Sequence, residues 1–220
     1  MVERLSSQDD PSTKLATFEL KRLISDPIFR NEFIARGGLV EITSLIERAS
    51  GNTLAYSLEA MAVLMESSSS WDGLDVVFIT RVSPPRSILT RPDRIQIVNI
   101  FATLPLININ RPAILILAQL ALYDPNLAPV SEGKKAAQHS TYAYGLGVLW
   151  PIIQRTPGFF TVLRDRLSSG DQSLIQAALR LTNALMRCAV VTRHYEVLEA
   201  IEGSEVIKAV IVSLPYSTLM

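Results

Sequence analysis

The sequence of 220 residues predicts an all-α protein, and three observations support that class. Apolar residues recur at steps of three and four over most of the chain, which is the spacing of one helix face. Aspartate followed by proline, and paired glycines, stand where these stretches begin and end, as helix caps do. No convincing run of alternating apolar and polar residues marks a strand. We therefore expect about ten helices and no sheet.

Four helices are predicted in the first 66 residues. Asp26-Pro27 begins the second helix, because aspartate caps free backbone N–H groups and proline fits the first helical position. Gly37-Gly38 ends it, since glycine readily adopts the left-handed conformation found at helix C-termini. Asn52, after Gly51, caps the fourth. The four helices span about residues 12–25, 27–36, 39–50 and 52–66.

The second, third and fourth helices together form a unit of about 40 residues: a short helix, a double-glycine turn and two longer amphipathic helices. Armadillo and HEAT arrays repeat a unit of about 40–47 residues. One such unit cannot bury its own apolar face, so about three must stack to be stable. The sequence thus predicts an armadillo/HEAT-like, right-handed helical solenoid.

The rest of the chain follows the same pattern less cleanly. Asn110, followed by Pro112, begins a strongly apolar helix, and Asp171 caps another. Two short helices are expected near the C-terminal end. The further predicted helices cover about residues 71–82, 110–122, 134–154, 157–167, 171–189, 193–201 and 204–214, and the segment 134–154 is either one long helix or two.

These elements suggest a division of the chain. We predict a disordered N-terminus at residues 1–11, first armadillo-like repeats at 12–82, further repeats at 100–215 and a tail at 216–220. Residues 83–99 break the pattern, because this stretch is rich in proline and arginine with poor helical spacing. It is either an irregular loop between repeats or an insertion foreign to the fold, such as translated intron sequence, and both interpretations stay open.

Composition restricts the function classes. Lysine plus arginine equals aspartate plus glutamate at 21 each, so bulk charge favours neither nucleic acid nor anionic membrane. Hydrophobic residues make up 48% of the chain, which suggests a large core or a partner surface. A single cysteine fits a reducing compartment, the N-terminus has no secretory signal, and no apolar stretch reaches the length of about 20 residues that spans a membrane. We therefore expect a cytoplasmic protein.

The candidate chemical residues are few. His139 and His194 are the only histidines, and neither has a metal-binding partner at ligand spacing. Cys188 lies in an apolar helix and is predicted to be a small buried hydrophobe. Gly145-Leu146-Gly147 lacks the lysine and third glycine of nucleotide-binding loops. Glutamates at three-residue steps in one helix are expected to form a solvated stripe: Glu196, Glu199 and Glu202.

We therefore predict no catalytic, cofactor-binding or metal site, and no enzyme. Pro84-Pro85-Arg86 matches a proline-rich SH3 ligand in only two prolines, so a plain loop is favoured. The sequence does not identify the residues that bind a partner.

One set of residues in the N-terminal segment forms a distinctive pattern: Glu32, Phe33, Ile34, Gly38, Leu39, Leu45, Ile46, Glu47, Leu54, Ala55, Leu64, Met65, Ser70, Trp71, Asp72, Leu74, Phe78 and Ile79. This pattern resembles the helical-repeat region of the ELMO (engulfment and cell motility) scaffold proteins. The resemblance covers about residues 12–82 and 105–215, and the stretch that contains Ser70-Trp71-Asp72 is its most specific part.

The resemblance implies a protein-interaction scaffold. Members of that family partner DOCK-type exchange factors that activate Rac, and so promote cytoskeletal rearrangement, phagocytosis of apoptotic cells and motility. It also implies a small-GTPase-binding domain before this region, and an ELMO domain, a pleckstrin-homology domain and a proline-rich tail after it. The contact with the exchange factor belongs to those later parts. A fragment or a mis-spliced version of a longer scaffold would explain their absence from this sequence.

Two alternatives remain at this stage. The chain could be an unrelated armadillo-type adaptor that binds another protein or peptide, since a shared fold does not fix function. An enzyme of unrecognised type would require a pocket that gathers His139 or His194 with carboxylates.

We also expect the last helices to expose apolar faces, which would make the isolated chain associate.

Overall fold

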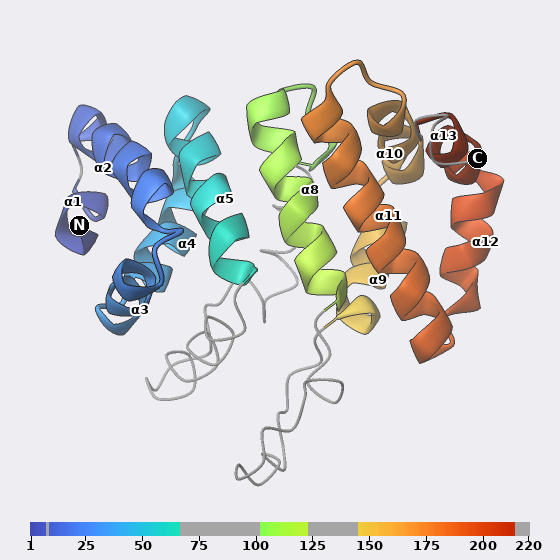
Figure 1. The fold of residues 1–220 in the computed structure, drawn as a ribbon, viewed down its shortest axis with the longest axis horizontal. Coiled ribbons are helices and arrows are strands. Elements are labelled where there is room, and N and C mark those ends of the chain that lie inside the picture. Colours follow the sequence, from blue (N-terminus) through green and yellow to red (C-terminus); the bar gives the residue numbers. More distant parts are fainter. Residues whose placement is uncertain (8, 67–101, 123–144, 214–220) are drawn as a thin grey trace, which may run out of the picture. The chain divides into compact units, whose positions relative to one another are not determined.

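The computed structural model describes residues 1–7, 9–66, 102–122 and 145–213, which form eleven helices and no strand (Figure 1). This confirms the all-α prediction. The chain divides into two compact units, Met1–Ile116 and Leu117–Met220, with the boundary inside one helix. The helix predicted at 71–82, the irregular stretch at 83–99, the first part of the segment predicted at 134–154 and the tail at 216–220 lie outside the described residues.

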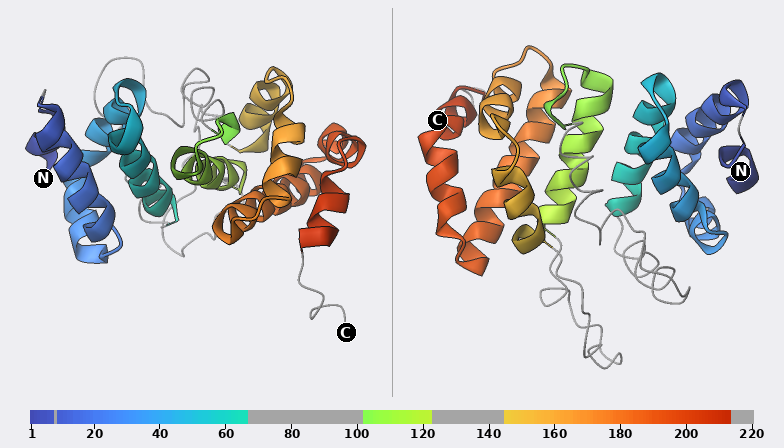
Figure 2. Two further views of the ribbon diagram at one scale, coloured as in Figure 1. Left: turned by 90° about the horizontal axis from the view of Figure 1, so that it is seen from above. Right: turned by 180° about the vertical axis from the view of Figure 1, so that it is seen from behind.

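The first unit contains α1 (Val2–Leu5), α2 (Asp10–Leu23), α3 (Pro27–Ala35), α4 (Gly38–Arg48), α5 (Gly51–Met65) and the first part of α8 (Ile107–Leu122). In this unit α2 lies alongside α5, as Figures 1 and 2 show, and α4 packs on α5. Fully buried leucine, isoleucine and methionine side chains fill the space between these helices: Leu20, Leu39, Ile42, Leu58, Met61 and Leu64.

The prediction of a disordered N-terminus is corrected, because Val2–Leu5 is helical and the next helix begins at Asp10. Val2–Leu5 forms α1, and the side chain of Leu5 is completely buried. Asp9 caps α2, since its carboxylate accepts a hydrogen bond from the Ser12 backbone N–H at 3.1 Å. Helix α1, with its buried leucine, packs against α2 and α4. This packing cannot be predicted from the sequence pattern of a four-residue helix.

The predicted turn between the second and third helices is confirmed. The Asp26 carboxylate accepts from the Phe29 N–H at 2.8 Å, and Pro27 opens α3. Gly37 has φ +81°, in the left-handed region that favours glycine. A Cβ atom on Gly38 would lie 2.4 Å from the Phe33 ring, so α4 can start this close to α3 only without a side chain there.

Two predicted helix starts are wrong by a few residues. Ser50, not Asn52, is the N-cap residue of α5. The helix predicted to begin at Asn110 already begins at Ile107, which places Pro112 inside α8. Asn110 is completely buried, and its side-chain amide donates to the Leu104 carbonyl at 2.7 Å instead of capping the helix.

The second unit contains α9 (Leu146–Gln154), α10 (Phe159–Leu167), α11 (Gln172–Thr192), α12 (Tyr195–Gly203) and α13 (Val206–Ser213). Helix α11 contacts α9, α10 and α12, and α13 packs on α10 and α12. Asp171 caps α11 as predicted, because its carboxylate accepts from the Leu174 N–H at 2.9 Å. The expectation that no apolar stretch reaches membrane-spanning length is wrong for α11, which is long and apolar enough by length and composition. Its buried side, however, forms the core of this unit.

Candidate interaction surfaces

Two rows of contacts join α2 to α5 in the first unit. In the first row, the rings of Phe18 and Tyr56 meet edge to face, with centroids 5.4 Å apart and planes at 60°. This is a favourable geometry for aromatic pairs. Phe18 is still 40% exposed, so the pair is an accessible aromatic feature and not part of the closed core.

The second row is an ionic group of three side chains. Glu59 on α5 forms ion pairs with Lys21 on α2 and with Arg111 on α8, the latter at 3.2 Å. The carboxylate-bearing side chain is only 16% exposed, whereas the two cations are 39% and 34% exposed. The Lys21 ammonium also lies 5.3 Å from the centroid of the Tyr56 ring, within cation–π range. One half-buried carboxylate therefore connects three helices of the same unit.

The two rows share one register. Phe18 and Lys21 are one helical turn apart on α2, as are Tyr56 and Glu59 on α5, so both helices run in the same direction across the rows. The partners in each row are separated by 38 residues of sequence. This separation is close to the length of one armadillo-type unit. Neither Tyr56 nor Glu59 stands out in the sequence, because their importance depends on this register between distant helices.

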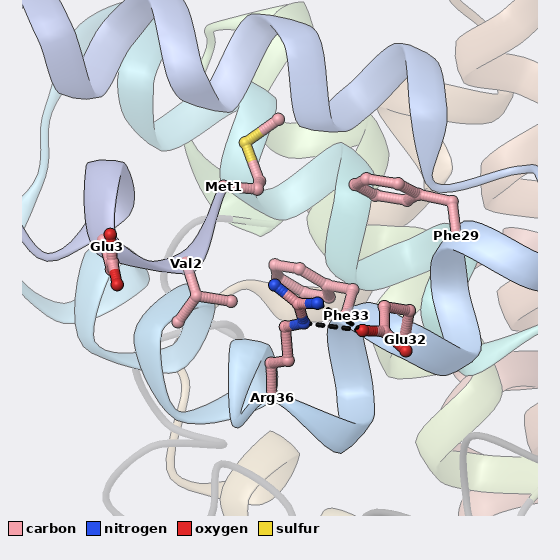
Figure 3. A pocket seen from close by; sticks show the side chains of 7 residues that line it. All are labelled: Met1, Val2, Glu3, Phe29, Glu32, Phe33 and Arg36. Carbon is pink, nitrogen blue, oxygen red and sulfur yellow. Dashed lines mark hydrogen bonds and ion pairs between the residues drawn. The ribbon is translucent and has the colours of Figure 1, made fainter.

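A pocket of about 570 Å³ lies between α1 and α3 (Figure 3). Phe29 and Phe33 line it with nearly parallel rings, whose centroids are 6.2 Å apart. Glu32 and Arg36 at its edge form an ion pair at 2.6 Å, drawn as dashed lines in Figure 3. The remaining lining residues come from the N-terminus: Met1, Val2 and Glu3. The pocket therefore offers an apolar wall with a largely neutralised rim, and Glu32 is held by Arg36.

Among the candidate chemical residues that the structure describes, none come together in a metal site. His194 shares a hydrogen bond with the Thr192 hydroxyl at 2.9 Å, and the Cys188 thiol donates to the Ala121 carbonyl at 3.0 Å. Cys188 is half-buried, so the prediction that it is buried is only partly met. Among the described residues, no three His, Cys, Asp or Glu side chains are placed to hold a metal ion. His139 and Pro84-Pro85-Arg86 lie outside the described residues.

The second unit exposes both charged and apolar side chains. The predicted glutamate stripe on α12 is confirmed as solvated, since Glu196, Glu199 and Glu202 are all exposed. Apolar side chains on the last three helices are also exposed by more than half: Val190, Val191, Tyr195, Ile211 and Val212. This agrees with the expected apolar face near the C-terminal end, while self-association of the chain stays a prediction.

Two solved structures of engineered proteins have a similar fold. An engineered protein from a structural-genomics programme has a TM-score of 0.58 and 16% identity, over 94% of this chain and 68% of the other. A designed armadillo repeat protein, YIII(Dq)4CqI, has a TM-score of 0.50 and 13% identity, over 94% of this chain and 88% of the other. At these identities the likeness concerns the fold alone, and it confirms the predicted armadillo-like architecture.

The sequence comparisons give the family. No curated protein matches the sequence. Residues 28–214 match the family described as "ELMO, armadillo-like helical domain", which confirms the resemblance stated above and excludes an adaptor of unrelated family. This chain belongs to the ELMO armadillo-like helical domain family.

Proposed function

We propose that this chain is a non-catalytic, cytoplasmic interaction module of an ELMO-type scaffold that acts with DOCK-type exchange factors in Rac signalling. The observation that carries the proposal is the family match over residues 28–214. In this role the helices present side chains to partner proteins and perform no reaction. Cytoskeletal rearrangement and phagocytosis of apoptotic cells would be its downstream effects.

The chemistry of the described side chains supports a binding role. The aromatic and ionic rows on α2, α5 and α8 combine accessible ring surface with fixed charges, which is what protein interfaces use for affinity and orientation. The thiol of Cys188 and the imidazole of His194 are both occupied by hydrogen bonds near a helix C-terminus. The family match and this surface favour a scaffold over the alternative of an enzyme.

The test measures Rac activation in cells that express the protein. Depleting the protein is expected to lower the level of GTP-bound Rac, measured by effector pull-down, and to reduce uptake of apoptotic corpses. Re-expression from a depletion-resistant transcript should restore both. Normal Rac activation and uptake after complete depletion would refute the role in this pathway.

A further inference from the structure

A basic and apolar cluster surrounds Phe18 on the outer side of α2. Its nearest neighbours on the helix surface are the residues three and four positions away: Lys14, Leu15, Lys21 and Arg22. We call these five residues the Phe18 surface. Phe18 is 40% and Leu15 52% exposed, so two adjacent apolar side chains lie in the middle of three cations. The ring of Tyr56 extends this apolar area toward α5.

The cations of this surface differ in whether they are already paired. Lys21 pairs with Glu59, which Arg111 also binds. The carboxylate in the middle of α2 itself belongs to Glu19, and it is paired with Arg4 at 2.7 Å. Lys14 and Arg22 are exposed and pair with no carboxylate in the part of the chain that the structure describes. Lys14 and Arg22, unpaired within the described ranges, therefore flank an accessible apolar centre.

We infer that the Phe18 surface docks an extended acidic segment of a partner protein, with carboxylates on Lys14 and Arg22 and one apolar side chain on Leu15 and Phe18. This inference rests on the proposed binding role, but not on the Rac pathway. Charge complementarity selects the sign of the partner, because basic or neutral segments would leave both cations without a counter-charge. The apolar centre requires a leucine, isoleucine or phenylalanine between the carboxylates.

The spacing on α2 sets the spacing in the partner. Lys14 and Arg22 are eight residues apart on a helix, which corresponds to about 12 Å along its axis. An extended chain covers about 13 Å in four residues, and residues at positions 1, 3 and 5 point to the same side. The expected motif is therefore acidic–x–apolar–x–acidic, with all three contact residues on one side of the strand.

An anionic membrane is the less suitable occupant. The edge-to-face contact with Tyr56 holds the Phe18 ring in place, which limits how deeply it can insert between lipids. Lys21 and Arg111 pair with Glu59, so among the described residues of this cluster Lys14 and Arg22 are the cations that remain for a lipid surface. Stable membrane attachment needs a larger basic patch or a second anchoring signal. The surface is suited to two localised carboxylates and not to a continuous sheet of negative charge.

The experiment selects peptides from a phage-displayed library of random linear 12-mers on the whole chain. The same library is applied to the double variant Lys14→Glu, Arg22→Glu and to a matched control, Arg180→Glu, Arg187→Glu, which makes the same charge change on exposed positions of α11. Circular dichroism checks that all three proteins keep their helical content. Affinities of the selected peptides are then measured by fluorescence anisotropy.

We expect the original chain and the α11 control to select the same acidic–x–apolar–x–acidic peptides, and the α2 variant to bind them about tenfold more weakly. Replacing the apolar residue of the peptide by serine should also reduce binding. No enrichment, enrichment of basic or neutral peptides, or equal binding to the α2 variant would overturn the inference.

A second assay tests the membrane alternative with vesicles containing phosphatidylserine. Sedimentation of the original chain with these vesicles, lost in the α2 variant but kept in the α11 control, would assign the surface to lipid and overturn the inference. We expect no such difference. Because the peptide assay uses purified protein, its failure is distinct from a failure of the Rac proposal in cells.

Discussion

Replacing Glu59 by glutamine is expected to lower the free energy of unfolding of the first unit by about 1–2 kcal/mol. The substitution keeps the size of the side chain but removes the charge that holds Lys21 and Arg111. A hydrogen bond to a charged group contributes about 1.5–3 kcal/mol, and an exposed ion pair about 0.2–1 kcal/mol. This site lies between those cases, since the carboxylate is 16% exposed while both cations reach water.

Urea unfolding, followed by circular dichroism, measures this loss. Raising the salt concentration to about 1 M, where the screening length is about 3 Å, should reduce the difference between the two proteins. A double-mutant cycle with Arg111→Gln should give a coupling of at least about 0.5 kcal/mol. Glu199→Gln is the control, because Glu199 is an exposed glutamate within α12.

The reasoning would be refuted by a change below about 0.3 kcal/mol in Glu59→Gln, or by an equal change in the Glu199→Gln control. Either result would mean that the ion pairs of Glu59 are no stronger than interactions with water. The arrangement of α2, α5 and α8 would then depend on apolar packing alone.

Three further predictions concern single positions. Gly38→Ala should cost about 1–3 kcal/mol of stability by pressing a methyl group into the Phe33 ring, and Phe33→Leu should recover part of that loss in thermal unfolding. Asp171→Ala should cost about 1 kcal/mol in urea unfolding by removing the N-cap of α11, while Asp171→Asn should keep most of the cap. The hydrogen bond and the charge of Lys208 hold the pKa of Glu205 below its ordinary value, so Lys208→Gln should raise that pKa in an NMR titration. Because the pKa of Glu205 is lowered in the folded chain, any stabilisation from this pair is present above the unfolded pKa and is lost as the pH falls through the folded pKa.

Helix boundaries were predictable where a local side chain decides them. Asp26 and Asp171 accept hydrogen bonds from backbone N–H groups three residues further on, a contact that depends only on neighbouring residues. Asn110 shows the opposite case, because it was expected to cap α8 but is buried within it. Its amide bonds to Leu104 before the helix, and tertiary burial overrides the local preference.

The candidate surface was less predictable than the fold. The spacing of Phe18 and Lys21 is visible in the sequence, and so is the spacing of Tyr56 and Glu59. The spacing on one helix does not show that these residues face the other helix. Apolar and charged residues at three-residue steps also occur on ordinary helix surfaces. Only the packing of α2 on α5 brings the four side chains together.

The shared register of the two rows also determines which changes of chain length the first unit can tolerate. One extra residue in the first turn of α5, before Tyr56, would rotate the rest of that helix by about 100° and separate both rows at once. The same residue added between α2 and α3, or between α4 and α5, can be absorbed by the connection. Related chains should therefore vary in length at these connections, and seldom within α2 and α5.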